Sequence, residues 1–561
     1  MITRECCRTI VNDGGTLAPP NATARIVWGL VGALLIVRIG AMFVVPLMDT
    51  TEARYAEIAR KMVQLNDWVT PWFDYGVPYW GKPPLSFWLT AISFQAFGIS
   101  EFAARLPHFV ASSAIAILVG WMAHRRDPKA TWPAIACIFG APLFFISSGA
   151  VLTDMELTLG STLTMAGFWI ALEEGSSFEP RLHLRLLATV LFVGGLTAGM
   201  LAKGPVSWLM IFVPIFLWTA CYSRWRDMLS PFPFIPGICA AVLISLPWYL
   251  LAERHTPGFL QYFFVGEHLH RFVSPGWHGD LYGNAHPSPI GAIWLFSFVD
   301  LLPWTVLLPI AAWRWHKPRP TRNALAKPTS ASVVTRFSGT LAAAISDMTP
   351  WQAYLILWAI TPLVLFTAAR NVGWTYILPS MPAGALLAAQ WMATQGRQGR
   401  NINRLLTIGL SLTMCLISAA AIPWLVPNTM ERKSAKALLA AYASAQSGQT
   451  GLPEANLAEP TPSKARPPLI FVHRRPFSAQ FYTGGRAILV RNASEAWSRI
   501  GRGSAYVAIS SANHFTGAGQ YRPANKERND AGGIHGDRSG ERNVRRIGRY
   551  GNFDLLFVEA L

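Results

Sequence analysis

Charged residues are scarce in this chain. Only 14% of its 561 residues are Asp, Glu, Lys or Arg, whereas soluble domains usually carry about 25%. Hydrophobic residues make up 52%. This balance argues against an ordinary soluble protein and favours a membrane protein.

Three other sequence features are rare or missing. No glycine-rich dinucleotide fingerprint is evident. A cleavable signal peptide is not evident either, because the first 25 residues are polar and the first apolar run, 26–48, is long enough to span a bilayer. Cysteines are few, and none falls in the polar C-terminal part, so we expect no disulfide framework or zinc-type site there. The cysteines are Cys6, Cys7, Cys137, Cys221, Cys239 and Cys415.

Long apolar runs dominate what is present. Each run is near the roughly 20 residues that a membrane-crossing helix needs. They predict an α-helical polytopic membrane domain over residues 1–427, with about 11–13 transmembrane helices. The runs lie at 26–48, 105–122, 131–150, 155–172, 186–202, 205–222, 233–252, 289–313, 351–369, 375–393 and 404–427. The apolar stretch 84–98 is shorter, and we interpret it as an interfacial helix.

Basic residues set the predicted orientation. The net charge of +18 is explained by cytoplasmic loops rich in Lys and Arg, so no nucleic-acid partner is needed. With the N-terminus in the cytoplasm, most basic loops fall inside, and treating 84–98 as a span would reverse this. The loop 49–104 is then periplasmic and the loop 314–350 cytoplasmic.

The composition changes after residue 427. Residues 428–466 are rich in Ala, Ser and Pro and predict a helix followed by a linker. Residues 467–561 contain strand-like segments and predict a small soluble α/β domain on the periplasmic side, with a helix at RPFSAQFY. The segment 512–545, rich in Gly, Asn and Arg, is predicted to be disordered.

The stretch Asp49–Pro84 mixes acids, bases and aromatics in a way that suits neither a lipid-facing span nor a plain solvated loop. Asp49 and Glu52 are candidate catalytic acids, although either alone is equally explained as a helix cap. Lys82 stands in extended backbone before two prolines. A lysine at headgroup level, surrounded by aromatics, is a good phosphate ligand.

Other polar residues fall on the same predicted side of the membrane. Asp154 is a third candidate acid, with helix capping as the alternative, and Lys203 binds phosphate or extends to the headgroups. The further candidates are Glu267, His268, Arg271, Arg370 and Tyr376. A Glu267–Arg271 ion pair and an interfacial anchor at Tyr376 are the plainer alternatives. We expect these loops to converge on one cavity.

These residue types predict chemistry on an anionic, lipid-bound donor. Lysines and arginines would bind its phosphate and stabilise it as a leaving group, while an acid deprotonates or orients the acceptor hydroxyl. The histidine spacing in GEHLHRF matches no helical metal pair. No cofactor is therefore required, with a divalent metal as the alternative.

A flippase for lipid-linked sugar is the alternative class of protein. A flippase would favour charged residues near the membrane midplane and inverted repeats, and Arg38, inside the first apolar run, is the residue that fits it best.

Several motifs resemble a known group of enzymes. DTTEARYAEIARKM, WGKPPLSFWL, TDMELTL, AKGP, LPWYLLAE, YFFVGEHLHRF and TYILPSMPA are similar to bacterial membrane glycosyltransferases of the aminoarabinose-transferase and protein O-mannosyltransferase superfamily. The resemblance covers about residues 45–390. It implies a GT-C fold, a polyprenyl-phosphate sugar donor and transfer to lipid A, another envelope glycolipid, or protein Ser/Thr at the periplasmic face of the inner membrane.

The resemblance also implies residue roles. An acid of the first loop acts as base, Arg54 and Lys82 hold the phosphate, and Tyr55 of the same EARY motif contacts substrate. The aminoarabinose enzymes usually read DETRY, whereas this chain reads TTEARY, so both Asp49 and Glu52 remain candidates.

Two further departures affect the expected sugar. Gly81 replaces the usual acid before the loop lysine, and VGWTY replaces KLPTY, which leaves Arg370 as the nearby cation. Because of these departures, the resemblance does not identify which sugar is transferred.

Overall fold

The computed structural model describes most of the chain. The described residues are 22–175, 181–225, 234–283, 286–315, 348–394, 399–425, 429–450, 467–501, 503–510, 535–536 and 542–560. Most of the predicted loop 314–350, the linker part of 428–466, most of 512–545, and Cys6 and Cys7 lie outside these residues.

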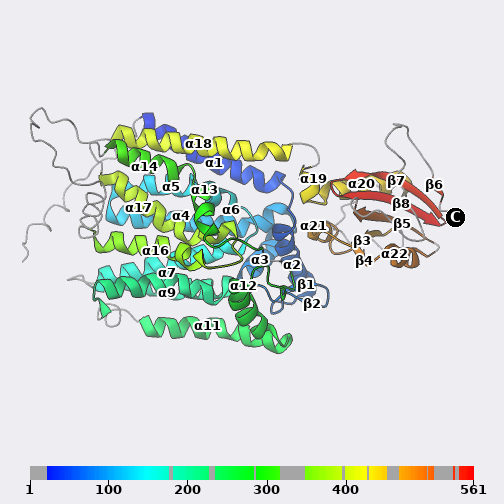
Figure 1. Ribbon diagram of the computed structural model, residues 1–561, viewed down its shortest axis with the longest axis horizontal. Helices are drawn as coiled ribbons and strands as arrows, with labels where there is room; N and C mark the ends of the chain where they lie inside the picture. The colour runs from blue at the N-terminus through cyan, green and yellow to red at the C-terminus, as the bar shows by residue number, and fades with distance from the viewer. Residues whose placement is uncertain are drawn as a thin grey trace, which may run out of the picture.

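Long helices lie side by side in a bundle, and a sheet domain stands at one end of it (Figure 1). Within the described residues, seven helices are long and apolar enough to cross a membrane. They are α1 (Ala22–Val44), α4 (Glu101–Arg126), α7 (Thr153–Gly175), α8 (Leu182–Lys203), α11 (Phe234–His255), α16 (Pro350–Thr367) and α18 (Gly399–Leu425). The multi-pass helical fold predicted from the sequence is confirmed.

The other four predicted spans form shorter or interrupted helices. One run divides into α5 (Thr131–Phe139) and α6 (Pro142–Ser147), and another forms the 17-residue α9 (Pro205–Cys221). The third run divides into α13 (Ala292–Asp300) and α14 (Trp304–Trp315), which are bent by 78°. The last run becomes a 3₁₀ turn, η3 (Trp374–Ser380), followed by α17 (Met381–Thr394). Counting the bent pair as one span gives up to eight spans in the described part.

Prolines account for much of this difference from the predicted 11–13 spans. A proline lacks the amide N–H that continues a helix, and its ring clashes with the preceding turn. Pro142 opens α6, and Pro303 stands in the break between α13 and α14. Hydropathy alone does not separate such interrupted runs from continuous spans.

The first loop is compact and largely buried. It contains α2 (Thr51–Leu65), a hairpin of β1 (Trp72–Asp74) and β2 (Val77–Pro78), and α3 (Leu85–Phe97). α3 occupies the stretch predicted to be interfacial and packs against α2 and α4. A π-helix, η2 (Gln261–His270), and the short α12 (Arg271–Val273) form part of the same end of the bundle (Figure 1).

The C-terminal part is a small mixed sheet with helices on both faces. Its strand order is β4-β3-β5-β8-β7-β6, with β3 parallel to β4 and β5 and the other pairs antiparallel. The strands are β3 (Leu469–Val472), β4 (Ile488–Val490), β5 (Ser504–Ser510), β6 (His535–Gly536), β7 (Arg542–Tyr550) and β8 (Phe553–Ala560). The helices are α19 (Thr429–Lys433), α20 (Lys436–Thr450), α21 (Phe477–Tyr482) and α22 (Ala493–Ile500). α20 and α21 share a core with one face of the sheet, and α22 shares a core with the other.

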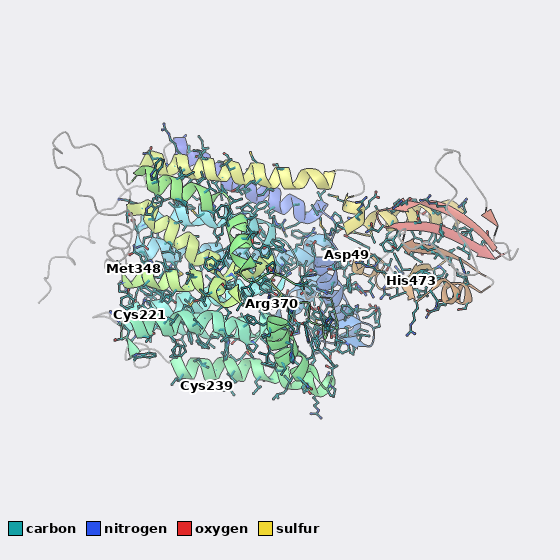
Figure 2. All side chains as sticks on the ribbon, viewed as in Figure 1. Asp49, Cys221, Cys239, Met348, Arg370 and His473 are labelled. Carbon is teal, nitrogen blue, oxygen red and sulfur yellow. The ribbon has the colours of Figure 1, made fainter. Side chains whose placement is uncertain are left out.

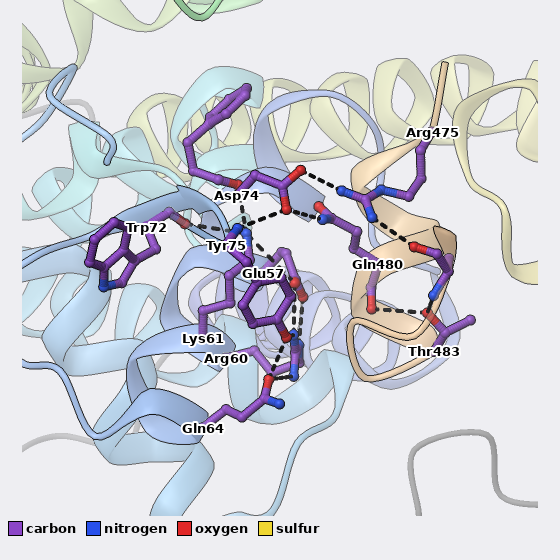
Figure 3. A network of polar contacts seen from close by, with 12 residues as sticks. Glu57, Arg60, Lys61, Gln64, Trp72, Asp74, Tyr75, Arg475, Gln480 and Thr483 are labelled. Atoms are coloured by element: carbon purple, nitrogen blue, oxygen red, sulfur yellow. Dashed lines mark hydrogen bonds and ion pairs between the residues drawn. The ribbon is translucent and has the colours of Figure 1, made fainter. Parts of the chain in front are cut away.

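α21 joins the C-terminal domain to the first loop (Figure 3). Arg475 Nη2 lies 2.6 Å from Asp74 Oδ2, and Gln480 Nε2 donates to Asp74 Oδ1 at 3.0 Å. The hydroxyl of Tyr482 accepts a hydrogen bond from the Leu47 amide at 2.8 Å. These contacts cross about 400 residues of sequence and fix the hairpin against α21.

A buried charged cluster on α2 supports the same hairpin (Figure 3). Lys61 is fully buried and donates to the Phe73 carbonyl at 2.6 Å. Burial lowers the pKa of Lys61 to about 8, although the Glu57 carboxylate opposes this shift. Arg60 pairs with Glu57 at 2.6 Å and donates to the Tyr75 hydroxyl at 3.0 Å. The charges therefore hold α2 to β1 and to the turn that follows it.

We expect a charge swap to test the interface between α21 and the hairpin. Asp74→Arg or Arg475→Asp alone should lower the thermal unfolding midpoint of the purified protein, because each places like charges in contact. The double variant should recover much of the loss. Differential scanning fluorimetry in detergent measures the midpoints, and Arg499→Asp in the exposed Glu495–Arg499 pair is the matched control. Absence of recovery in the double variant would contradict the contact.

Candidate functional site

A pocket lies at the end of the bundle that faces the C-terminal domain. Seven residues predicted from the sequence line it, and they come from five separated segments of the chain. The lining residues are Lys82, Asp154, Leu157, Lys203, Val206, Met210, Phe263, Glu267, His268, Arg271, Phe272, Phe366, Ala369, Asn371 and Tyr376. Figure 2 labels Asp49 at this end and Cys221 and Met348 at the opposite end.

One carboxylate connects two of the pocket cations. Glu267 Oε2 lies 3.1 Å from Lys82 Nζ and 2.8 Å from Arg271 Nη1. Burial by itself would raise the pKa of Glu267, but the Lys82 and Arg271 charges outweigh it and lower the pKa to about 2. Glu267 is therefore ionised at neutral pH and holds both cations at the pocket wall.

A second carboxylate holds the third cation. Lys203 Nζ lies 2.6 Å from Asp154 Oδ1 and 4.8 Å from the centroid of the Tyr376 ring. Tyr376 in turn accepts a hydrogen bond from Arg271 Nη2 at 3.3 Å. Asp154 is in the first turn of α7, where the helix dipole favours a negative charge. The two carboxylates and three cations thus form one connected network.

The turn after Lys203 fixes that lysine. Gly204 has φ +73°, and a Cβ there would approach the Phe263 ring to 2.6 Å, so a side chain is excluded. His268 Nε2 lies 3.2 Å from the Lys203 carbonyl, and its Nδ1 lies 2.8 Å from the Phe263 carbonyl. Burial lowers the pKa of His268, so the ring is neutral at pH 7. It packs the π-helix η2 against the turn between α8 and α9.

The pocket has two chemically different sides. Lys82, Lys203 and Arg271 supply the polar side. The apolar side is formed by Leu157, Val206, Met210, Phe272, Phe366 and Ala369. Such a pocket suits an amphipathic anion, whose phosphate contacts the cations and whose hydrocarbon contacts the apolar wall.

Two of the three candidate catalytic acids do not line the pocket. The Asp49 carboxylate accepts hydrogen bonds from the backbone and hydroxyl of Ser478 in α21, the backbone one at 3.1 Å. Glu52 forms two contacts with Arg105, at 2.8 and 2.9 Å, and accepts from the Met48 amide. Asp154 is therefore the candidate acid that the fold brings to the cations.

Three other predicted residues also lie outside the pocket lining. Arg54 Nη1 donates to the Tyr282 carbonyl at 2.9 Å, and its guanidinium lies 5.3 Å from the centroid of the Tyr55 ring. The Tyr55 ring packs against Tyr79 and Phe87. Arg370 contributes backbone hydrogen bonds to residues 272 and 288.

Sequence reasoning missed two residues that organise the site. Asn371 lines the pocket, and its side chain donates to the carbonyls of Arg271 and Ser274 while accepting from the Gly276 amide. The only sequence feature that could have identified Asn371 was its position next to the candidate Arg370. Arg105, the partner of Glu52, was visible as an arginine at the start of a predicted span.

Among the residues that the structure describes, no group of three or more His, Cys, Asp or Glu side chains is arranged to hold a metal ion. The absence of a metal requirement stays a prediction.

We expect Glu52→Gln to affect stability far more than chemistry. The Arg105 side chain is 3% exposed, and removing the charge of its carboxylate partner costs on the order of a few kcal/mol. The unfolding midpoint should fall by several degrees, and Arg105→Met in addition should restore part of it. Turnover per folded molecule should stay near that of the parent. A loss of turnover with an unchanged midpoint would instead return Glu52 to the list of catalytic acids.

Comparisons with known proteins agree with this architecture. The family model for dolichyl-phosphate-mannose-protein mannosyltransferase matches residues 33–263. An undecaprenyl phosphate-alpha-4-amino-4-deoxy-L-arabinose arabinosyl transferase of Pseudomonas aeruginosa is 30% identical over 397 residues, covering 68% of this chain and 63% of the relative. The same-named protein of Edwardsiella ictaluri is 30% identical over 387 residues, covering 67% and 62%. The matched region thus spans under two thirds of these relatives.

A solved structure shows the fold over nearly the whole chain. ArnT from Cupriavidus metallidurans, bound to undecaprenyl phosphate, superposes with a TM-score of 0.66 and 17% identity, covering 96% of this chain and 98% of that one. The protein is therefore a multi-pass membrane protein with the GT-C fold. Over the matched region its sequence is similar to glycosyltransferases whose names refer to dolichyl-phosphate mannose and undecaprenyl phosphate-aminoarabinose.

Proposed function

We propose that the protein transfers a sugar from a polyprenyl-phosphate carrier to lipid A or another envelope glycolipid. The observation that carries the proposal is the pocket, where Lys82, Lys203 and Arg271 face an apolar wall and Asp154 lies beside them. The names of the similar proteins, which refer to undecaprenyl phosphate and dolichyl phosphate, support the same donor class. The chemistry needs no cofactor or metal, because protein cations supply the positive charge.

The donor would bind with its phosphate on the cations and its first isoprene units along the apolar wall. Glu267 holds Lys82 and Arg271 within reach of one group. Because these cations are held before the donor arrives, little reorganisation is needed when negative charge develops on the leaving phosphate. Tyr376 accepts a hydrogen bond from Arg271 and its ring lies against the Lys203 ammonium group, so it joins Lys203 to the other two cations around the same phosphate.

Transfer would proceed in one displacement with inversion at the anomeric carbon. The acceptor hydroxyl oxygen forms a bond to that carbon, and the bond from the carbon to the phosphate oxygen breaks. The electron pair leaves with polyprenyl phosphate, whose new charge faces Lys82, Lys203 and Arg271. Asp154 takes the hydroxyl proton as general base. Asp154 is in the first turn of α7, next to the Lys203 ammonium group.

We further propose that the protein lies in the bacterial inner membrane with its N-terminus in the cytoplasm. The pocket and the C-terminal domain would then face the periplasm. The asymmetry of Lys and Arg among the loops supports this orientation. The C-terminal domain, docked on the first loop through α21, would form the outer cover of the site.

An in vitro transfer assay tests the proposed function. The purified protein, reconstituted in lipid nanodiscs, is supplied with a panel of undecaprenyl-phosphate sugars and with lipid A. Mass spectrometry measures glycosylated lipid A, and chromatography measures released undecaprenyl phosphate. A Ser/Thr peptide in a parallel reaction tests a protein acceptor. If no donor in the panel releases undecaprenyl phosphate with any acceptor, the proposed function is wrong.

A further inference from the structure

The charge of the pocket is unevenly balanced. Three cations line it, Lys82, Lys203 and Arg271, against two carboxylates, Asp154 and Glu267. The neutral ring of His268 adds nothing at pH 7. The lining side chains therefore carry one net positive charge, contributed within a largely buried site.

Both carboxylates are already in contact with cations. Glu267 Oε2 faces both Lys82 and Arg271, at 3.1 and 2.8 Å. Asp154 Oδ1 faces Lys203 at 2.6 Å. A bound ammonium group would have to approach these acids next to cations that hold them, and like charges at such short range repel strongly where water is scarce.

The neighbouring acids are not among the residues that line the pocket. Glu52 contacts Arg105, and Glu156, which is 1% exposed, lies 2.7 Å from His108 Nδ1 in the core of the bundle. Residue 81, next to Lys82, is Gly, and a Cβ there would approach the Tyr79 hydroxyl and ring to 2.9 Å. Tyr79 is only 1% exposed and packs on Tyr282. The buried ring thus occupies the space from which a side chain at position 81 would reach the site.

A charge count for the donor follows. A polyprenyl-phosphate sugar is a phosphodiester with one negative charge, so a donor with an uncharged sugar balances the single positive charge of the pocket. An amino sugar adds an ammonium group, makes the donor zwitterionic and leaves the pocket charge uncompensated. We propose that the sugar transferred by this protein carries no ammonium group and is a neutral sugar. The inference rests on the proposed function and names the substrate class of that site.

This assignment separates the chain from the proteins it resembles. The similar proteins of Pseudomonas aeruginosa and Edwardsiella ictaluri are named for 4-amino-4-deoxy-L-arabinose. In this chain both pocket carboxylates contact cations, which leaves neither of them for an ammonium group.

A matched donor pair tests the inference. Undecaprenyl phosphate-L-arabinose and its 4-amino-4-deoxy counterpart differ by a hydroxyl against an ammonium group at one carbon. The parent protein in nanodiscs, with lipid A as acceptor at pH 7, should show a kcat/KM about tenfold or more higher for the neutral donor. An equal or higher kcat/KM for the amino donor overturns the inference while the proposed function stands. Consumption of neither donor, nor of any other undecaprenyl-phosphate sugar, overturns both.

A variant tests the electrostatic cause. Lys203→Met removes one pocket cation and brings the count to zero, so the preference for the neutral donor should shrink severalfold even though total turnover falls. Lys436→Met is the control, because Lys436 is half exposed and pairs with Glu101 outside the pocket lining; its donor ratio should match the parent. An unchanged ratio in Lys203→Met would contradict the charge argument.

Discussion

Asp154→Asn should lower kcat for sugar transfer by about 10²–10⁴-fold, the range that general base catalysis contributes. The amide keeps the shape of the carboxylate and can still accept a hydrogen bond from Lys203, now 2.6 Å from Asp154 Oδ1. It cannot accept the acceptor's proton. The KM for the donor should therefore change little, because the phosphate contacts are retained. Initial rates with saturating undecaprenyl-phosphate sugar and lipid A measure the effect.

The control for Asp154→Asn is the same substitution outside the pocket. Asp127→Asn changes a cap of the 3₁₀ turn Pro128–Ala130, where the side chain accepts from the Lys129 amide. Its kcat should equal that of the parent. Asp49→Asn, which loses contacts to Ser478, should reduce stability and keep turnover per folded molecule. Asp154 is excluded as the base if its Asn variant turns over normally.

Lys82→Gln should raise the KM for the donor by about 10- to 100-fold, because a charge-assisted hydrogen bond to phosphate contributes about 1.5–3 kcal/mol. The kcat should fall as well, since the leaving phosphate develops charge in the transition state. Glu267 would retain Arg271 at 2.8 Å, so the pocket should stay assembled. Rates over a range of donor concentrations separate the two effects.

Two comparisons make the Lys82 result specific. Lys129→Gln, an exposed lysine outside the pocket lining, should leave both constants unchanged. Lys82→Arg should recover part of the loss in KM, because a cation is restored. If Lys82→Gln lowered the unfolding midpoint but left the KM for the donor unchanged, the lysine would be a structural partner of Glu267 and the phosphate role would be wrong.

Much of this site could be predicted from the sequence because it depends on helix ends. Asp154 and Lys203 are at the ends of α7 and α8, where apolar runs stop. In the orientation predicted from the basic loops, such residues share one membrane boundary. Periodicity and hydropathy also located α21 and the strands β3, β4, β5 and β8, since those segments keep their local patterns. β6 and β7 were missed, because β6 and the start of β7 fall in the Gly-, Asn- and Arg-rich segment 512–545 that was predicted to be disordered.

The remaining assignments depend on partners distant in the chain. Glu52 is tied to Arg105, 53 residues away, and Asp49 to Ser478, 429 residues away. A local sequence motif does not contain these distant partners, so both acids remained candidate catalytic residues. The interruptions between α5 and α6 and between α13 and α14 depend equally on single prolines inside apolar runs.

The contact between α21 and the first loop also has a consequence for biosynthesis. Residues 49–78 are translated early, yet Ser478, Arg475 and Gln480 emerge from the ribosome about 400 residues later. Throughout that interval Asp49 and Asp74 lack the residues that hold them in the finished protein. The first loop therefore gains these contacts last, when α21 and the residues beside it dock on it.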